Sequence, residues 1–292
     1  MPKHLLTGEE FSTLELKEIL SLAKNLKKNR GEYQNTLKNK HLALIFEKPS
    51  LRTRFSFTVA MRELGGDVVE SQNQTSKFEE PQDTARVLGG YCQGIMLRTH
   101  DDENLKKMIE CAPVPIINGL SAKHHPCQIL ADLMTLEEHY ESLDGLKLSY
   151  VGDANNILNS LILLAPRFGV EVHYCIPCGR NIEEEILKRC DQSLIFAHKS
   201  PEEAVKNSHA VYTDVWTSMG FDQADESLFE GFQVNEELMA KADPRAIFMH
   251  CMPMCRGKEV SVTLPDDKCS AIFRQSENRL HVQKAVLMKL LN

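Results

Sequence analysis

The segment from Ser50 to Arg54 carries the residues best suited to chemistry in this chain. It follows an apolar run, Leu42–Phe46, and opens a stretch with helix-like composition. The start of a helix exposes unpaired backbone N–H groups and the positive end of its dipole, and both attract phosphate. Arg52, Arg54 and the hydroxyls of Ser50 and Thr53 would add donors for a dianion. The alternative is an N-cap serine followed by a basic first turn on a solvated surface.

A second pair of candidates is His125 and Gln128. Pro126 suits the first turn of a helix, and residues three apart share one helical face. An imidazole at that place can donate to a carbonyl oxygen, and an amide can recognise an N–H₂ group. The alternative is a histidine that only caps the helix, and the tetrapeptide alone favours that simpler role.

A third set consists of Asp214, Ser218 and Met219, which precede Gly220. A carboxylate at a strand end can pair with an ammonium group, while a hydroxyl and backbone N–H groups can bind a carboxylate. The set therefore suits a zwitterionic α-amino acid, and the alternative is a strand that ends in a glycine turn. Cys251 follows another apolar run, but no Cys-His-Asp order surrounds it, so we expect no covalent nucleophile there.

Composition narrows the class of protein. The chain has 292 residues and 42% apolar content, enough for a core divided between two domains. The formal charge of −7 argues against nucleic acid as a partner, and no apolar run reaches the ~18 residues of a membrane helix. Nine cysteines and a polar N-terminus without a signal-peptide segment indicate a reducing cytoplasm. The pair Cys175 and Cys178 is weak evidence for zinc, and we expect ordinary thiols.

Strand-like and helix-like segments alternate in two series. In the first half we expect strands Leu42–Phe46, Asp67–Ser71, Gly94–Arg98 and Val114–Asn118, with helices Leu14–Lys28, Arg52–Leu64, Gln82–Gly90 and Asp102–Cys111. In the second half we expect strands Leu146–Val151, Glu171–Ile176, Leu194–Ala197, Ala210–Asp214 and Ala246–His250, with helices Asn156–Phe168, Ile182–Cys190 and Pro201–Asn207. The run His124–Tyr140 would pass between the series, and a last helix, Glu277–Leu291, would follow them. This pattern predicts an α/β fold of two doubly wound, Rossmann-like parallel sheets joined by interdomain helices.

Ligands of doubly wound folds bind beyond the carboxyl ends of the strands. The candidates fall at such ends, since Arg98 and Asp214 each close a predicted strand and Gly152–Asn156 follows Val151. That loop has one glycine and lacks the G-x-G-x-x-G spacing of dinucleotide sites, and no Walker A pattern occurs. We therefore expect neither NAD nor ATP as a ligand.

Taken together, these segments resemble the carbamoyltransferase (transcarbamylase) family, and within it the ornithine branch. The matching stretches occur in the family's order over nearly the whole chain: Phe46–Arg54, Asp83–Leu88, His125–Leu133, Gly152–Asn156, Asp214–Gly220, His250–Pro253 and Glu277–His281. The first and third are common to the aspartate and ornithine branches. The stretches at Asp214 and His250 indicate ornithine.

The resemblance implies a role for each matched residue. Those that would bind carbamoyl phosphate are Ser50, Leu51 (through its backbone), Arg52, Thr53, Gln74, Arg98, His125, Gln128, Cys251, Met252 and Arg279. Those that would bind ornithine are Asn156, Asp214, Ser218 and Met219. The catalytic set would be Thr53, Arg98, His125 and Cys251. In the family the loop that holds Gln74 belongs to a neighbouring subunit.

The implied activity is carbamoyl transfer from carbamoyl phosphate to the δ-amine of ornithine, with no metal or organic cofactor. The implied domains are residues 1–132 for carbamoyl phosphate, with a C-terminal helix 276–292 packed back on them, and residues 133–275 for ornithine. A homotrimer or a multiple of it is implied as well. Other amines remain alternatives, namely putrescine, aspartate and N-acylated ornithine. Leu51 replaces the threonine usual in the ornithine branch, and versions acting on N-acylated ornithines resemble it.

Overall fold

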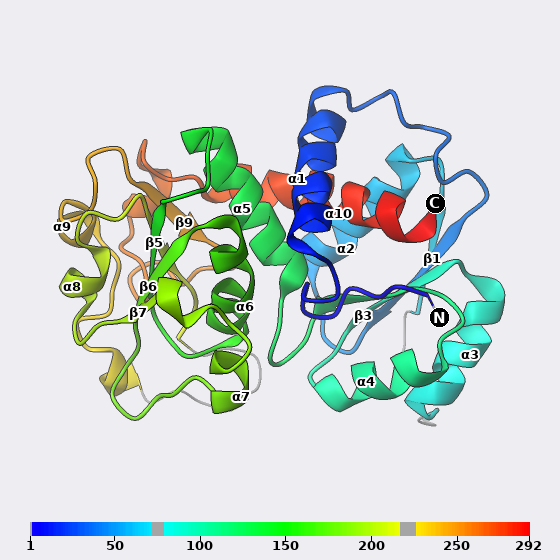
Figure 1. Cartoon of the computed structure of the whole chain (residues 1–292), viewed down its shortest axis with the longest axis horizontal. Coiled ribbons are helices and arrows are strands. Elements are labelled where there is room, and N and C mark those ends of the chain that lie inside the picture. The colour runs from blue at the N-terminus through cyan, green and yellow to red at the C-terminus, as the bar shows by residue number, and fades with distance from the viewer. Residues whose placement is uncertain (1, 72–78, 217–225) are drawn as a thin grey trace. The chain divides into compact units, whose positions relative to one another are not determined.

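The structure is a computed structural model that describes residues 2–71, 79–216 and 226–292. The described chain divides into two compact units, and each is considered by itself (Figure 1). Unit 1 comprises residues 1–131 and 278–292, and unit 2 comprises residues 132–277. Two helices, α5 (Pro126–Tyr140) and α10 (Ile272–Leu291), each begin in one unit and end in the other.

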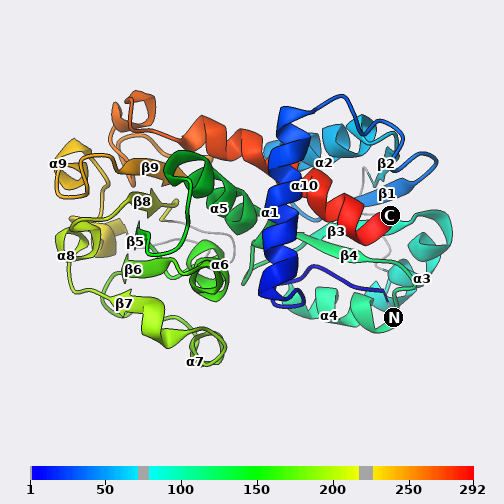
Figure 2. The ribbon, with the colours of Figure 1, turned by 45° about the horizontal axis from the view of Figure 1, so that its top comes forward.

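Unit 1 is built on a four-stranded parallel sheet in the order β2-β1-β3-β4. Its strands are β1 (His41–Phe46), β2 (Asp67–Glu70), β3 (Gly94–Arg98) and β4 (Ile116–Leu120). Its other helices are α1 (Thr13–Lys28), α2 (Leu51–Glu63), α3 (Pro81–Tyr91) and α4 (Asp102–Cys111). In Figure 2, α3 and α4 lie on one side of the sheet and α2 and α10 on the other. The strand order reverses between β1 and β3, which is where such sheets bind ligands.

Unit 2 has a five-stranded parallel sheet in the order β7-β6-β5-β8-β9. Its strands are β5 (Lys147–Val151), β6 (Glu171–Cys175), β7 (Ile195–Ala197), β8 (Ala210–Thr213) and β9 (Ile247–His250). Its helices are α6 (Asn156–Leu164), α7 (Glu184–Leu187), α8 (Pro201–Val205) and α9 (Glu236–Met239), besides its parts of α5 and α10. Here the order reverses between β5 and β8. The prediction of two doubly wound parallel sheets is confirmed.

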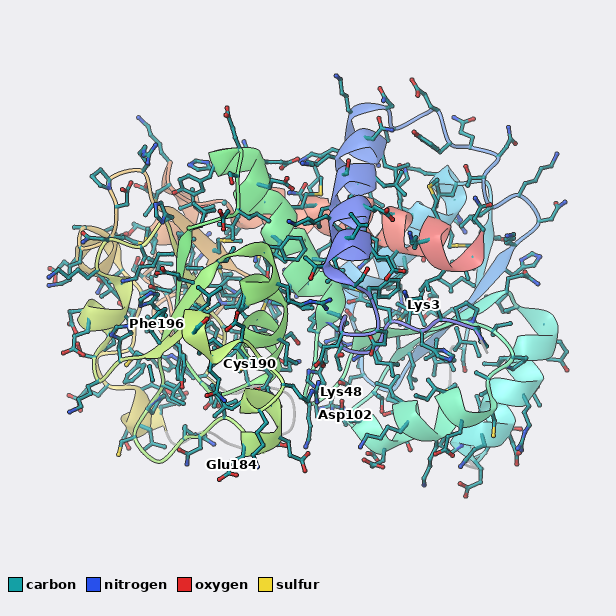
Figure 3. All side chains as sticks on the ribbon, viewed as in Figure 1. Lys3, Lys48, Asp102, Glu184, Cys190 and Phe196 are labelled. Carbon is teal, nitrogen blue, oxygen red and sulfur yellow. The ribbon has the colours of Figure 1, made fainter. Side chains whose placement is uncertain are left out.

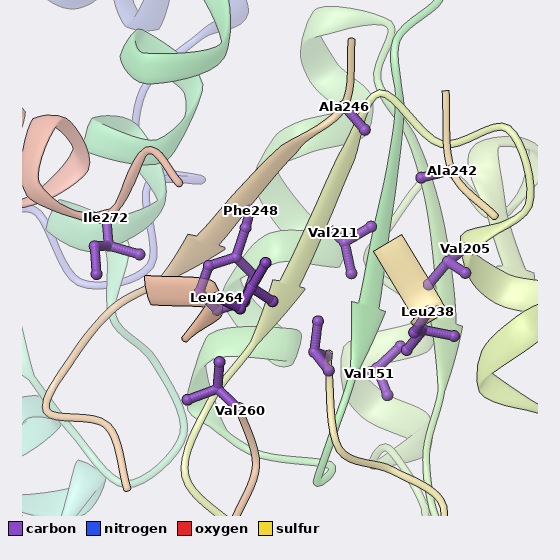
Figure 4. Packing of buried hydrophobic residues seen from close by; sticks show 11 residues of the cluster. Val151, Val205, Val211, Leu238, Ala242, Ala246, Phe248, Val260, Leu264 and Ile272 are labelled. Carbon is purple, nitrogen blue, oxygen red and sulfur yellow. The ribbon is translucent and has the colours of Figure 1, made fainter. Parts of the chain in front are cut away.

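Apolar side chains from strands and helices fill the interior of unit 2. Val151, Val211 and Phe248 project from β5, β8 and β9 into a fully buried cluster (Figure 4). Ile272, the first residue of α10, belongs to the same cluster. At the edge of the sheet Phe196, labelled in Figure 3, stacks on His173 with 4.5 Å between ring centroids. The core thus fixes the strands whose carboxyl ends carry the candidate site.

Several predicted boundaries are wrong by a few residues. Helix α10 begins at Ile272 rather than Glu277, because burial of Ile272 in the core extends the helix backwards. Strand β4 begins at Ile116 rather than Val114, since Pro115 has no N–H to offer a neighbouring strand. Helix α7 has four residues, of which only Ile186 is buried, so its apolar face supports no longer helix. Within the described residues no helix is long and apolar enough to cross a membrane.

Candidate active site

The start of α2 in unit 1 is a cluster of hydroxyls and arginines. Ser50 caps the helix, because its side-chain oxygen accepts from the Thr53 backbone N–H at 3.3 Å. Arg98, at the end of β3, donates to Ser50 Oγ at 3.2 Å and to Thr53 Oγ1 at 3.3 Å. Arg279 of α10 donates to Thr53 Oγ1 at 2.7 Å. The fully buried Thr53 hydroxyl therefore holds two guanidinium groups together beside a helix start.

No acidic residue lies in the first turn of α2 to offset this positive charge. Arg54 points elsewhere, although the segment taken alone offered both of its arginines as donors to an anion. Its guanidinium forms an ion pair with Glu70 at 2.8 Å and lies over the Phe46 ring, 5.0 Å from the centroid. The remaining groups are suited to a small, highly charged anion, because N–H donors and arginine forks converge on one helix start.

His125 lies in unit 1 just before α5 and is 3% exposed. Burial, together with Arg279, Arg98 and Arg52, holds the pKa of its imidazole well below the usual range. The ring is therefore neutral, and it can donate one N–H without carrying charge. The fully buried Gln128 follows on the first turn of α5. Both residues thus belong to the same unit as the arginine cluster.

Glu47 is a residue of this region whose role the sequence did not reveal. Its carboxylate, after β1, accepts from Thr99 Oγ1 at 2.6 Å, from the His100 N–H at 3.2 Å and from Asn104 Nδ2 at 3.4 Å. Its backbone N–H donates to the Arg98 carbonyl at 3.0 Å. Glu47 thereby ties the loop that carries Ser50 to the strand end that carries Arg98.

In unit 2 the carboxylate of Asp214 lies just beyond β8 and is 6% exposed. Asn155 Nδ2 donates to one oxygen at 2.8 Å, and the Cys251 thiol donates to the other at 3.0 Å. Asn155 also caps α6, since its Oδ1 accepts from the N–H groups of Ile157 and Leu158 at 3.0 and 3.2 Å. An acid so placed is suited to bind a cationic or neutral amine.

The segment after β9 is held by a buried histidine. His250 Nδ1 accepts from the Met252 N–H at 2.8 Å, so Nε2 carries the proton and donates to Glu259 at 3.2 Å. The metal-ligating atoms of Asp214, His250 and Cys251 lie within 4.8 Å of one another. Both ring nitrogens of His250 already have partners, so we assign no metal to this trio. The arrangement instead fixes the backbone of Cys251 and Met252.

Two further acidic or phenolic groups border Asp214. Tyr150 is fully buried and donates to Asn155 Oδ1 at 3.2 Å, and burial raises its pKa well above the usual value. Asp153 is also fully buried, and its ion pair with Arg180 has an N–O distance of 3.3 Å. Burial raises the pKa of Asp153, and Arg180 counters that shift.

The remaining predicted residues lie as follows. Leu51 and Arg52 begin α2, Gln128 lies on α5, and the buried Asn156 begins α6. Asn155, one residue earlier, donates to Asp214, and the sequence had not singled it out. Gln74, Ser218 and Met219 lie outside the described residues.

The fold and these groups define a class of protein: a parallel α/β enzyme with groups suited to an anion in one unit and groups suited to an amine in the other. The chain belongs to the aspartate/ornithine carbamoyltransferase family. Residues 3–138 match its carbamoyl-P binding domain, and residues 144–290 match its Asp/Orn binding domain. The resemblance inferred from the motifs is thereby confirmed, and the protein is a carbamoyltransferase.

Individual relatives agree over the full length. The ornithine carbamoyltransferase of Archaeoglobus fulgidus is 42% identical over 300 residues, covering 99% of this chain and 97% of the relative. The structure of ornithine carbamoyltransferase from Thermus thermophilus is 41% identical, with a TM-score of 0.92 and 100% of both chains covered. The enzyme of the same name from Pyrococcus furiosus is 39% identical, with a TM-score of 0.93, and covers 99% of this chain and 97% of its own.

Proposed function

We propose that this enzyme transfers the carbamoyl group of carbamoyl phosphate to the δ-amine of L-ornithine, giving L-citrulline and phosphate as a step of arginine biosynthesis. The observation that carries the choice of amine is Asp214, a buried acid held by Asn155 and Cys251 where the strand order of unit 2 reverses. Full-length relatives named ornithine carbamoyltransferase, at about 40% identity, support the same substrate.

We assign the phosphate to the start of α2. Its oxygens would accept from Arg52, Arg98, the Ser50 and Thr53 hydroxyls and the backbone N–H groups of the first turn, with Arg279 behind them. The Leu51 side chain is 69% exposed, so we infer that its backbone N–H, and no side-chain hydroxyl, serves the phosphate.

We assign the carbamoyl carbonyl to Arg98 and His125. Nitrogen attack on the carbonyl carbon moves negative charge onto the carbonyl oxygen, and the phosphate then leaves with the electron pair. Donors already aimed at that charge lower the barrier, commonly by several kcal/mol (about 3 for one donor). A neutral imidazole held among arginines suits this task, because it donates without titrating near neutral pH. Gln128 would accept from the carbamoyl N–H₂, and Cys251 and the Met252 carbonyl would complete the reacting centre.

On the amine side, Asp214 and Asn156 would bind the ornithine backbone, together with Ser218 and Met219. The attacking δ-amine must be neutral, yet such an amine has a pKa near ~10.4 in water. The enzyme therefore has to select the deprotonated form, with its proton passing to solvent, to the departing phosphate or through Cys251. Holding both substrates in place can supply about 7–11 kcal/mol in favourable cases. We expect neither a metal nor an organic cofactor.

We further propose a homotrimer, or a multiple of it, in the cytoplasm. Large apolar side chains are exposed at helical spacing on unit 1: Leu51 and Phe55 on α2, at 69% and 62%, and Val87 and Tyr91 on α3, at 43% and 71%. Val69 on the edge strand β2 is 57% exposed as well. Exposed apolar groups of this number support association with another copy, and Gln74 would reach a neighbour's site.

Citrulline formation from carbamoyl phosphate tests the reaction, with ornithine, putrescine, aspartate and N-acetylornithine run in parallel. We expect ornithine to be used at least about 100-fold better than the others by kcat/KM, since buried groups left unpaired by a wrong substrate are costly. A preference for N-acetylornithine or aspartate would contradict the proposed amine. Light scattering of the same preparation gives the oligomeric state, and a monomer at micromolar concentration would contradict the trimer.

A further inference from the structure

Unit 2 contains a fully buried polar cluster that lies under the ends of the strands bearing the amine-side residues. Its members are Asp132 on α5, Tyr212 on β8, His250 at the end of β9 and Gln275 on α10. Gln275 Nε2 donates to Asp132 Oδ1 at 2.7 Å and lies 3.1 Å from the Tyr212 hydroxyl. Gln275 Oε1 accepts from the His250 backbone N–H at 3.0 Å.

The orientation of the Gln275 amide is fixed by its partners. A backbone N–H can only donate, so the amide oxygen must meet His250, and the N–H₂ group must then meet the Asp132 carboxylate. The Tyr212 hydroxyl donates to the same carboxylate, and its pKa is raised well above the usual value by burial and by that negative charge. Every bond in this cluster has one allowed direction. Because these bonds are buried and directional, they hold the groups they join in a fixed mutual arrangement.

Each member of the cluster lies within four residues of a proposed site residue along the chain. His250 immediately precedes Cys251, and Tyr212 lies two residues before Asp214, which is 3.0 Å from the Cys251 sulfur. On the helices, Asp132 follows Gln128 by four residues and Gln275 precedes Arg279 by four residues. Residues four apart lie about one helical turn, ~5.4 Å, from each other on the same side of a helix.

We propose that Gln275 is a positioning residue. Through the His250 backbone it fixes the position of Cys251 and Met252 relative to Asp214, and through its own bonds it fixes them relative to α5 and α10. This inference rests on the proposed function for the identity of the amine. It explains why a buried glutamine occurs at a place where an apolar side chain would pack at less cost.

Reversing the direction of the hydrogen bond between Gln275 and Asp132 tests the proposal. Gln275→Glu still accepts from His250 but presents a second carboxylate to Asp132, so the pair must take up a proton. In the double variant Gln275→Glu/Asp132→Asn, the new amide at position 132 donates to the new carboxylate at position 275. The pair again has one donor and one acceptor, and its net charge equals that of wild type. We expect Gln275→Glu to lower kcat/KM for the amine by about 10-fold or more, and the double variant to recover to within about 3-fold of wild type.

The pH dependence adds a readout that loss of folding would not give. In Gln275→Glu the active form holds an extra proton in the cluster, so its kcat/KM should fall as pH rises, relative to wild type. The double variant has no such proton to lose and should follow the wild-type profile. The carbamoyl phosphate Kd, measured by calorimetry, should change by less than about 3-fold in both variants.

Two matched tyrosine variants control for a general loss of polar contacts. Tyr212→Phe removes the hydroxyl from the cluster. Tyr140→Phe removes a hydroxyl from α5, the helix that also carries Asp132. The Tyr140 hydroxyl is hydrogen-bonded to the carbonyls of His209 and Arg245 at 2.6 and 2.8 Å, and these two residues precede β8 and β9. Both should alter the melting temperature by similar amounts, but only Tyr212→Phe should reduce turnover of the amine.

The inference is overturned if the double variant is as impaired as Gln275→Glu while both melt like wild type, or if Tyr140→Phe reduces turnover as much as Tyr212→Phe. The cycle is measured with whichever amine the wild-type enzyme uses best. A wild-type preference for an amine other than ornithine therefore overturns the proposed substrate alone, and the rescue still decides the role of Gln275.

Discussion

The two units place their candidate groups at the same position of the same kind of sheet but give them opposite charge. In unit 1 Arg52 and Arg98 follow β1 and β3, between which the order reverses, and the Thr53 hydroxyl joins Arg98 to Arg279 of α10. In unit 2 the reversal between β5 and β8 carries the buried Asp214, held by neutral donors. The parallel sheet therefore decides where a ligand binds, and the strand-end residues decide which charge it has.

The units also differ in how their charges are stabilised. In unit 1, burial and the nearby Arg279, Arg98 and Arg52 lower the pKa of His125, so positive charge is already gathered at the start of α2. In unit 2 the Asp214 carboxylate is covered by an amide and a thiol, which an arriving amine would replace. Unit 1 thus gathers several positive charges in one place, whereas in unit 2 hydrogen-bonding groups cover the negative charge of Asp214.

The strongest test of this contrast is Arg98→Ala. The Arg98 guanidinium is bonded to both Ser50 and Thr53, and we expect it to stabilise charge that develops during the reaction. Loss of such a donor should lower kcat by about 10²–10³-fold, as measured by steady-state citrulline formation. A loss below about 10-fold would remove Arg98 from the reacting centre.

A reciprocal pair of substitutions separates the two units. Asp214→Ala should weaken ornithine binding by about 10–100-fold, because a hydrogen-bonded charge is lost, and should leave the carbamoyl phosphate Kd nearly unchanged. Arg52→Ala should do the reverse. Calorimetric titration of each variant with each substrate measures both, and a swapped or shared loss would contradict the division between units.

The buried His125 of unit 1 makes the free energy of unfolding depend on pH. Because burial and the arginines lower the pKa of His125, the unfolded chain binds a proton below about pH 6.5 that the folded chain does not. Stability should thus be complete above that pH and fall as pH is lowered. In His125→Asn the decline of the urea-unfolding free energy between pH 6.5 and 5 should be shallower, and an unchanged slope would contradict a neutral imidazole.

The smallest expected effect belongs to Arg54→Ala. Its ion pair with Glu70 is partly exposed, with side chains 41% and 22% accessible, so the cost to stability should be below about 1 kcal/mol. Turnover and the carbamoyl phosphate Kd should stay within about 2-fold of wild type. A large rise in that Kd would mean that Arg54, and not only Arg52, binds the phosphate.

Much of the framework was predictable, because strand periodicity and strand-end polar residues are local features of the sequence. The two sheets, the helix start at Ser50 and the strand-end positions of Arg98 and Asp214 were all found in this way. The direction of Arg54 was not, since it depends on Glu70, which a neighbouring strand brings alongside. Long-range pairing of this kind leaves no mark in the spacing of residues.

Three other residues were missed for different reasons. The last helix was expected to begin at Glu277, so Gln275 seemed to lie outside it. The start of α6 was placed correctly at Asn156, but the cap residue Asn155 was missed, because its contact with Asp214 depends on the pairing of β5 with β8. Glu47 was noticed only as part of its segment, since its three partners follow β3.

Asn155 constrains how this enzyme can change by mutation. One amide caps α6 with its oxygen and holds Asp214 with its nitrogen. Aspartate at 155 would keep the cap but set two carboxylates against each other, while serine would keep the cap and fall short of Asp214. Evolution toward a different amine would therefore require substitutions at positions 155 and 214 together, because either substitution alone would impair the enzyme.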